Sequence, residues 1–408
     1  MSHTKHLADL LKVCSILPAL VIMPAMAESL SERQVITQDK TYKNLTVDGI
    51  SSSVANNGGV FYLEDVQDVL LTFKGESKFV NNSILNGGMG AVIGNGWLST
   101  KDADKWNPYT PGGHILFDGD TLFMNNTTNN ANGAGAIFNY GIGTVDNPDI
   151  LFNGEAEFIG NSSTGVSNSF CVGGGAIYHR DGMIVFNDDA NFVANSSASK
   201  GGAIMAAGGI VFRGEADFEE NKASSQGGAL AILGGNVVFE KEASFKNNSA
   251  NAGAAISMDA SNASVTFKDF VLFDRNTGTA TLWNNSSTGT VVFENGAKFY
   301  QNTNTQNGTL QNAGDVTLNS GDFVFMHNTG GNGGGLKNAG TVTVDTTGNV
   351  LFDTNITKST GGAVDNGGTL TLTAANVSFL GNTSDAGYAG AIFNSGDMSI
   401  LGATNVFS

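Results

Sequence analysis

The sequence predicts an all-β protein, a single parallel β-helix (solenoid) of about 12 coils with an N-terminal cap. The first observation is compositional: the 408-residue chain has 55 glycines, five prolines and 14% charged residues. Glycine at this density disfavours long helices, by roughly 1 kcal/mol for each interior position. The second observation is a Phe-x-x-Asn element at nearly fixed spacing, which is typical of a solenoid. Its phenylalanines lie at 79, 123, 158, 192, 218, 245, 273, 299, 325, 352 and 379.

Residues 201–226 show how one coil is built. This unit opens with Gly-Gly-Ala-Ile, continues with Ile-Val-Phe and ends in Phe-x-x-Asn. Glycine allows the chain to bend sharply at the corners, and strand alternation directs the isoleucine and phenylalanine inward. Equivalent residues of successive coils then stack about 4.8 Å apart. We expect an interior phenylalanine column and an asparagine ladder, represented by Phe192, Asn195, Phe218, Asn221, Phe245 and Asn248.

Three segments are expected along the chain. Residues 1–27 have the lysines, apolar run and Ala-Met-Ala ending of a signal peptide. Residues 28–55 lack the repeat and are interpreted as a capping segment, because an open stack of strands exposes backbone groups. Residues 56–408 form the β-helix, which we expect to be a passenger truncated at its C-terminus. No later segment has the roughly 20 apolar residues of a membrane-spanning helix, so we expect an exported chain.

Charge and cysteine content exclude several functions. The formal net charge of −17 argues against nucleic acid as a partner, because binding to phosphates requires clustered lysine and arginine. Cys171 is the only cysteine after residue 27, so no internal disulfide is expected. The three later histidines, His114, His179 and His327, are far apart and form no metal-binding motif. We expect neither a metal site nor a cofactor.

The tetrapeptide at 201–204, paired with Phe-x-x-Asn at 218–221, resembles the passenger repeats of the chlamydial polymorphic membrane proteins, a family of autotransporters. The resemblance covers residues 56–408. It implies a right-handed parallel β-helix displayed on the bacterial outer surface and used in adhesion to host cells. Members of this family continue into a C-terminal membrane barrel, which this sequence lacks. Association with the outer membrane is therefore expected only through a missing barrel.

The longest interruption of the repeat lies between Val92 and Ile115 and is the first candidate binding site. It contains Trp97, Trp106 and Tyr109. Exposed aromatic side chains give large contact areas for proteins or sugars, so we interpret this insertion as a recognition loop for a host-cell or other surface protein or glycan. The alternative is that both tryptophans fold back onto the coil beneath, since tryptophans are usually mostly buried. Shorter insertions at 141–149 and 162–172 lie in the same region.

A second candidate is an apolar stripe at the outward middle position of the strand that ends in phenylalanine. Polar residues are expected at this position in a solvated sheet, whereas apolar ones suggest a contact surface for a partner. The alternative is that the chain's own loops cover the stripe. Its members are Leu116, Leu151, Val185, Val211 and Val238.

The sequence favours a non-catalytic adhesin or binding scaffold, and two other functions are alternatives. One is a carbohydrate-active β-helix enzyme, a polysaccharide lyase or hydrolase, which needs paired acidic or basic groups on adjacent coils. The runs His179-Arg180-Asp181 and Asp188-Asp189 are its nearest candidates, but neither recurs at the same phase in neighbouring coils. Solvated turns explain both runs as well, so we expect no catalytic residues. The other function is a purely structural stalk.

Overall fold

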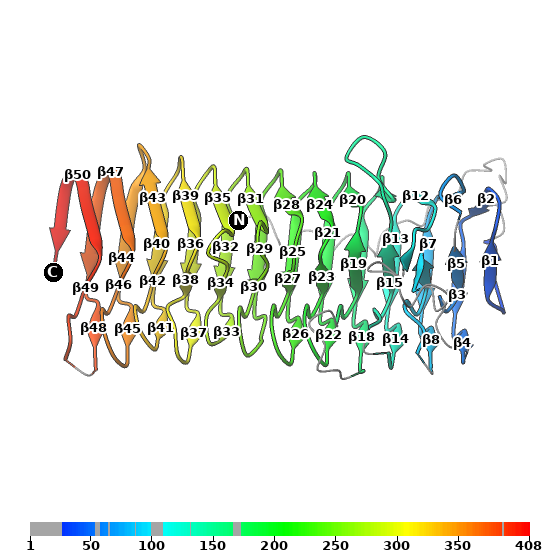
Figure 1. Ribbon diagram of the computed structural model, residues 1–408, viewed down its shortest axis with the longest axis horizontal. Coiled ribbons are helices and arrows are strands. Elements are labelled where there is room, and N and C mark those ends of the chain that lie inside the picture. Colours follow the sequence, from blue (N-terminus) through cyan, green and yellow to red (C-terminus); the bar gives the residue numbers. More distant parts are fainter. Residues whose placement is uncertain are drawn as a thin grey trace, which may run out of the picture.

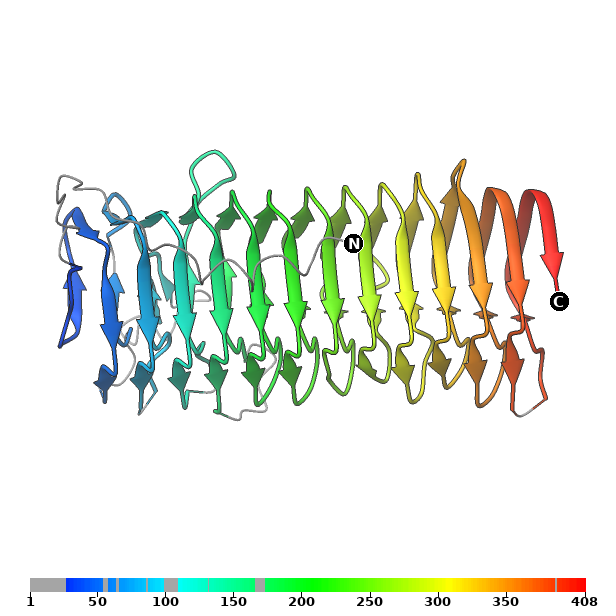
Figure 2. The same ribbon diagram turned by 180° about the vertical axis from the view of Figure 1, so that it is seen from behind.

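The computed structural model describes residues 27–53, 58–63, 66–85, 87–98, 109–130, 132–165, 173–385 and 387–408. These residues form a rod of stacked coils that contains strands and no helix. Figures 1 and 2 show the coils following one another along the long axis, from the blue first coil to the red last coil. The predicted all-β parallel β-helix of about 12 coils is confirmed. Within the described ranges, no helix is long and apolar enough to cross a membrane.

The first sheet has 13 parallel strands, one from each coil. Apart from the first strand, each begins at the last residue of the Gly-Gly-Ala-Ile position. In most of them this residue is a buried aliphatic residue. They are β1 (Gln34–Ile36), β5 (Phe61–Leu63), β9 (Ile93–Asn95), β15 (Ile137–Tyr140), β19 (Ile177–Asp181), β23 (Ile204–Ala206), β27 (Leu230–Ile232), β30 (Ile256–Met258), β34 (Leu282–Asn284), β38 (Leu310–Asn312), β42 (Leu336–Asn338), β46 (Val364–Asn366) and β49 (Ile392–Asn394).

The second sheet receives two consecutive strands from most coils, and a bend separates them. The earlier strands are β2 (Lys40–Lys43), β6 (Leu70–Lys74), β12 (His114–Asp118), β16 (Ile150–Phe152), β20 (Met183–Phe186), β24 (Gly209–Phe212), β28 (Asn236–Phe239), β31 (Ser264–Phe267), β35 (Thr290–Phe293), β39 (Asp315–Leu318) and β43 (Thr341–Asp345). The later strands are β3 (Thr46–Asp48), β7 (Ser77–Val80), β13 (Thr121–Met124), β17 (Ala156–Ile159), β21 (Ala190–Val193), β25 (Ala216–Glu219), β29 (Ala243–Lys246), β32 (Val271–Asp274), β36 (Ala297–Tyr300), β40 (Phe323–Met326) and β44 (Asn349–Asp353). In the last two coils, β47 (Thr369–Leu380) and β50 (Asp397–Phe407) run through both positions.

Very short strands close most of the coils in two further sheets, one of six strands and one of five. The six are β4 (Ser51–Ser52), β8 (Ser83–Ile84), β14 (Thr127–Thr128), β18 (Ser162–Ser163), β22 (Ser196–Ser197) and β26 (Lys222–Ala223). The five are β33 (Thr277–Gly278), β37 (Thr303–Asn304), β41 (Thr329–Gly330), β45 (Ile356–Thr357) and β48 (Thr383–Ser384).

Phenylalanine side chains fill the interior in two columns, as the repeat predicts. Phe218 stacks between Phe192 and Phe245, with ring centroids 4.9 and 4.8 Å apart and planes within 4° of parallel. It also meets Phe212 of the other column edge to face, at 5.9 Å and 83°. Both geometries are favoured for aromatic pairs. The register is parallel and in phase, since Phe192, Phe218 and Phe245 are direct partners in β21, β25 and β29.

The predicted asparagine ladder is also confirmed. Asn221 accepts at Oδ1 from the backbone N–H and the Nδ2 of Asn195, both at 3.0 Å. Its own backbone N–H and Nδ2 donate to Oδ1 of Asn248 at 2.9 and 3.0 Å. Its Nδ2 also donates to the carbonyl of Phe192 at 2.8 Å. Asn195, Asn221 and Asn248 are fully buried, and these bonds satisfy the amides that burial removes from water.

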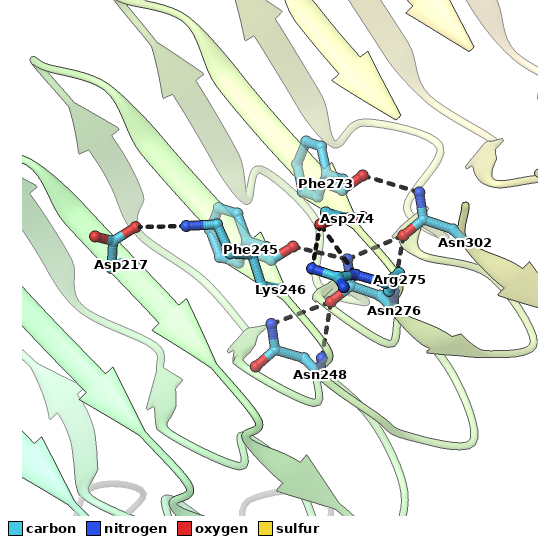
Figure 3. A network of polar contacts seen from close by, with 9 residues as sticks. All are labelled: Asp217, Phe245, Lys246, Asn248, Phe273, Asp274, Arg275, Asn276 and Asn302. Atoms are coloured by element: carbon cyan, nitrogen blue, oxygen red, sulfur yellow. Dashed lines mark hydrogen bonds and ion pairs between the residues drawn. The ribbon is translucent and has the colours of Figure 1, made fainter. Parts of the chain in front are cut away.

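Figure 3 shows the same bonding in the next coils, where Asn276 lies between Asn248 and Asn302. The ion pair of Lys246 with Asp217 lies outside the ladder at 3.6 Å, with both side chains partly exposed. Such surface pairs add little stability, so the buried ladder contributes more than this pair to the polar side-chain links between coils. Its members are Asn82, Asn126, Asn161, Asn195, Asn221, Asn248, Asn276, Asn302, Asn328, Asn355 and Asn382.

The residue before each ladder asparagine has a left-handed backbone conformation, with φ between 52° and 63° at all eleven positions. In each coil the phenylalanine points inward and the next residue points outward. The left-handed residue follows, and its turn directs the asparagine inward again. Only glycine adopts it without a steric penalty, yet most coils use another residue. The eleven are Asn81, Asn125, Gly160, Ala194, Glu220, Asn247, Arg275, Gln301, His327, Thr354 and Gly381.

Ala194→Gly is therefore expected to stabilise the protein. Ala194 is exposed and has φ 54°, and glycine relieves the left-handed strain at the expense of some backbone entropy, for a net gain of about 0.5–1 kcal/mol. Gly160 already occupies the same position one coil earlier. Urea unfolding measures the change. Ala198→Gly, at a position without positive φ, is the matched control and is expected to destabilise; equal effects of the two changes would contradict the strain argument.

The predicted cap was residues 28–55, and within it residues 34–52 form a complete first coil. Its strands β1 to β4 pair in register with β5 to β8. Tyr42 stacks on Phe73 at 5.9 Å, and Val47 takes the place of the second phenylalanine. Ser29 bridges to Thr46 and so covers part of the outer edge. A coil without the repeat motifs can thus continue the stack because it supplies apolar residues at the same interior positions.

Candidate recognition surface

The longest insertion begins and ends as a hairpin. β10 (Trp97–Leu98) follows β9 directly and pairs antiparallel with β11 (Tyr109–Thr110), which leads back to β12. The predicted recognition residues Trp97 and Tyr109 therefore lie on neighbouring backbone strands at the base of the insertion. Trp106 lies outside the described residues. This pairing holds the two ends of the insertion side by side where it leaves the regular coil.

A second insertion, residues 141–149, connects β15 to β16 and projects beyond the line of bends in Figures 1 and 2. Reciprocal backbone hydrogen bonds between Thr144 and Asn147, at 3.0 and 3.2 Å, close its tip. Ile142 and Val145 are 63% and 43% exposed. The tip therefore has a defined backbone shape and presents aliphatic side chains to solvent.

Asp149 anchors this second insertion. The residue is 2% exposed, and its carboxylate accepts hydrogen bonds from the backbone N–H groups of Ile142 at 3.0 Å, Gly143 at 2.8 Å and Met183 at 2.7 Å. Burial raises the pKa of Asp149, and the three N–H donors oppose that rise by favouring the charged form. One carboxylate thus links both ends of the insertion to the next coil.

His114 joins the two insertions. It begins β12, at the return from the longest insertion, and its Nδ1 lies 2.8 Å from the carbonyl of Pro148 in the second. Because a carbonyl can only accept, Nδ1 donates its hydrogen in this contact. Nε2 lies 3.4 Å from Nδ2 of Asn147. The imidazole is therefore held in one orientation, with Nε2 facing the tip.

These contacts enclose a polar pocket of about 200 Å³. Three segments that are far apart in the sequence form it: the turn at 67–68, the return of the first insertion and the tip of the second. Its lining residues are Gln67, Asp68, Gly112, His114, Ile142, Gly143, Thr144, Asn147 and Asp149. The sequence indicated that both insertions lie in this region, but their contact depends on how the coils stack.

The apolar stripe is aligned as predicted, since its five members are direct partners in successive strands of the second sheet. Their burial differs along the rod. Leu116, Leu151 and Val238 are half-buried, whereas Val185 and Val211 are buried. The centre of the stripe is therefore not an open surface, which favours the alternative that other parts of the chain cover it there.

A row of buried residues on the outer side of the first sheet was missed from the sequence. Phe138, Tyr178, Met205 and Ala231 are direct partners in β15, β19, β23 and β27. They are fully buried and form a cluster separate from the interior core. The sequence feature that could have predicted this row is an apolar residue directly after the tetrapeptide in each of these coils. A sheet with one face in solvent would have a polar residue there.

His179, the histidine weighed for catalysis, lies in a second ladder. It is fully buried, and its Nδ1 accepts from Nδ2 of Asn139 at 3.1 Å. Its Nε2 donates to the carbonyl of Gly209 at 2.9 Å. Asn139 in turn accepts from Asn95 at 2.7 Å. The imidazole therefore replaces an asparagine amide as a structural link, and both of its nitrogens are occupied.

The second ladder resumes in later coils. Asn284, Asn312, Asn338, Asn366 and Asn394 bond from coil to coil at 2.7–3.0 Å. Each of the last four also donates to the carbonyl of a glycine two residues later. The sequence signal was an Asn-x-Gly element repeated every 26 to 28 residues.

Asp189 of the acidic pair Asp188-Asp189 belongs to a row of carboxylates at one bend of successive coils, so the expectation that no acidic group recurs at this phase in neighbouring coils was wrong. The Asp189 carboxylate accepts from the backbone N–H of Glu215 at 2.8 Å, and that of Asp188 from the N–H of Asp189 at 2.9 Å. Burial raises the pKa of Glu155 in this row, and the neighbouring carboxylates raise it further. The row comprises Glu76, Asp120, Glu155, Asp189, Glu215 and Glu242.

No family model matches the chain, and searches of curated proteins and of solved structures gave no match. Among the described residues, no group of three or more histidine, cysteine, aspartate or glutamate side chains is arranged to hold a metal ion. The fold and the geometry of the insertions are therefore the basis for assigning a function.

The titration of His179 has a measurable consequence. Burial lowers the pKa of His179 to about 4, whereas an unfolded histidine titrates near 6.5. Between these values the unfolded chain binds the additional proton, so this residue lowers the free energy of unfolding by up to about 1.4 kcal/mol for each pH unit of acidification. His179→Asn, which keeps an amide in the ladder, is expected to remove this slope.

Urea unfolding of both proteins at several pH values between 7 and 4, the range set by the two pKa values, measures the difference. Comparing them at each pH cancels the contributions of the carboxylates, including Asp181 and Asp149 near the imidazole. His327→Asn, which changes an exposed histidine, is the control and should keep the wild-type slope. A wild-type slope in His179→Asn would contradict the proposed titration.

Proposed function

We propose that this protein is an exported, surface-displayed β-helical passenger that acts as a non-catalytic adhesin or binding scaffold. The observation that carries the proposal is the convergence of two insertions on one pocket, through His114 and Pro148. The repeat side chains, by contrast, are occupied within the rod by stacking and ladder bonds. A rigid scaffold that carries loops of irregular sequence is a common arrangement for binding. The partner is a host-cell or other surface protein or glycan.

Export is supported by residues 1–27, which have the pattern of a signal peptide. The resemblance of the repeats to autotransporter passengers agrees with display on a bacterial outer surface. Expression of the full chain in a Gram-negative host, followed by N-terminal sequencing of the extracytoplasmic fraction, tests this part. A new N-terminus at Glu28 is expected, and retention of Met1 on a cytoplasmic product would refute export.

Binding is tested by incubating the fluorescently labelled protein with cultured epithelial cells and measuring bound label by flow cytometry. Replacement of residues 99–108 by a Gly-Ser linker of equal length is expected to reduce binding at least fivefold, because it removes Trp106 and most of the sequence of the longest insertion. The matched control is Lys298→Ala with Tyr300→Ala, which changes the outer face of β36, far from the insertions. Equal binding by all three proteins would reject the insertions as the contact surface.

A further inference from the structure

We propose that the pocket formed by residues 67–68, His114 and the 141–149 insertion binds one neutral sugar residue of a glycan. This inference rests on the proposed binding function and specifies its ligand class. Its basis is the set of side chains around the pocket: the two amides of Gln67 and Asn147, the hydroxyl of Thr144 and the imidazole of His114. All of these groups are able to form hydrogen bonds with sugar hydroxyls.

The walls of the pocket are fixed before any ligand arrives. Asp149 binds three backbone N–H groups, and the Thr144–Asn147 hydrogen bonds close the tip. His114 is held by its bond to Pro148, so its Nε2 has one direction. A site that is already ordered loses little conformational entropy on binding, which suits a small ligand with few contacts.

The polar groups match hydroxyls better than ions. A sugar hydroxyl both donates and accepts, and the amides and the threonine hydroxyl can do both as well, while the Asp68 carboxylate accepts. None of the described residues that line the pocket is a lysine or arginine, and Asp68 and Asp149 disfavour an anionic ligand there. Sulfated or carboxylated sugars are therefore poor candidates, and neutral ones are favoured.

The apolar part and the size complete the match. Ile142 lines the pocket and is 63% exposed, so its side chain can cover the C–H face of a sugar ring. Pockets for drug-sized ligands measure about 300–1,000 Å³. The 200 Å³ here fits one ring, with the rest of the glycan left in solvent.

Saturation-transfer difference NMR with the full chain tests the assignment. The probes are the methyl glycosides of glucose, galactose, mannose and N-acetylglucosamine, each at millimolar concentration, with a heparin-derived disaccharide as the anionic probe. We expect transfer to at least one neutral glycoside and none to the disaccharide. Asn147→Ala and His114→Ala are each expected to weaken the apparent affinity about tenfold, whereas His327→Ala and Asn332→Ala, on distant coils, leave it unchanged.

Circular dichroism and thermal unfolding of each variant establish that it is folded. Absence of transfer to every neutral glycoside would overturn the proposal, and so would transfer that survives in both folded pocket variants or that favours the heparin disaccharide. The outcome is separable from that for the binding function. If Asn147→Ala and His114→Ala bind cells normally and no glycoside shows transfer, the sugar assignment fails while the adhesin proposal stands.

Discussion

Replacing Asn221 by leucine is expected to lower the free energy of unfolding by about 3–5 kcal/mol, because leucine fills a similar volume but makes no hydrogen bonds. The change leaves the backbone N–H of Asn195 without its acceptor, Oδ1 of Asn221. It also removes the side-chain Nδ2, which donates to Asn248 Oδ1 and to the Phe192 carbonyl. Each buried group left unpaired costs about 1–3 kcal/mol. Urea denaturation followed by circular dichroism measures the loss.

Asn319→Leu is the matched control, since Asn319 is exposed and its replacement should change stability by less than about 0.5 kcal/mol. Asn221→Asp provides a second comparison. Its carboxylate still accepts from Asn195 but cannot donate to Asn248, so a substantial loss is expected near neutral pH. If Asn221→Leu were no more harmful than the control, the ladder would be a consequence of stacking and would contribute little to it.

Phe218→Ala is expected to destabilise the rod by about 3–5 kcal/mol. The ring is fully buried and stacks on Phe192 and Phe245 at 4.9 and 4.8 Å, with an edge-to-face contact to Phe212. Alanine leaves a cavity that in-register backbones on both sides cannot close. Because each coil contacts only its neighbours, amide hydrogen exchange should accelerate first in 190–193 and 243–246.

The control for this change is Phe393→Ala, whose ring is 37% exposed in the last coil; its effect should be smaller and confined to that coil. Uniform acceleration of exchange along the whole rod after Phe218→Ala would contradict the nearest-neighbour argument. Unchanged exchange in the two flanking strands would show that the cavity is absorbed locally.

The interior of the rod could be predicted from the sequence because its chemistry repeats. Phe218 and Asn221 recur with a constant offset of three residues, and stacking of equivalent positions follows from parallel pairing. The position between them could not be predicted. Residue 220 and its equivalents share a left-handed backbone but range from glycine to arginine and threonine, so no residue type marks it.

The candidate site was only partly predictable. The insertions were visible as breaks in the repeat, and Tyr109 and Trp97 do lie at the base of one of them. The pocket was not visible, because His114 and Asn147 are 33 residues apart and meet only when two coils are stacked. The sequence offered His179 as a candidate for acid–base chemistry. In the structure it belongs to the second ladder, which begins with Asn95 and Asn139 and links the coils.

The asparagine ladder also gives the rod a chemical direction. At every step two N–H groups of one asparagine converge on a single oxygen of the asparagine in the following coil, as for Asn221 and Asn248. A coil displaced by one residue would place a different side chain at that point and leave both donors unpaired. The ladder therefore acts as a register check during assembly, added to that of the apolar columns: a one-residue shift would turn the phenylalanines outward and would also leave the paired donors without the matching amide.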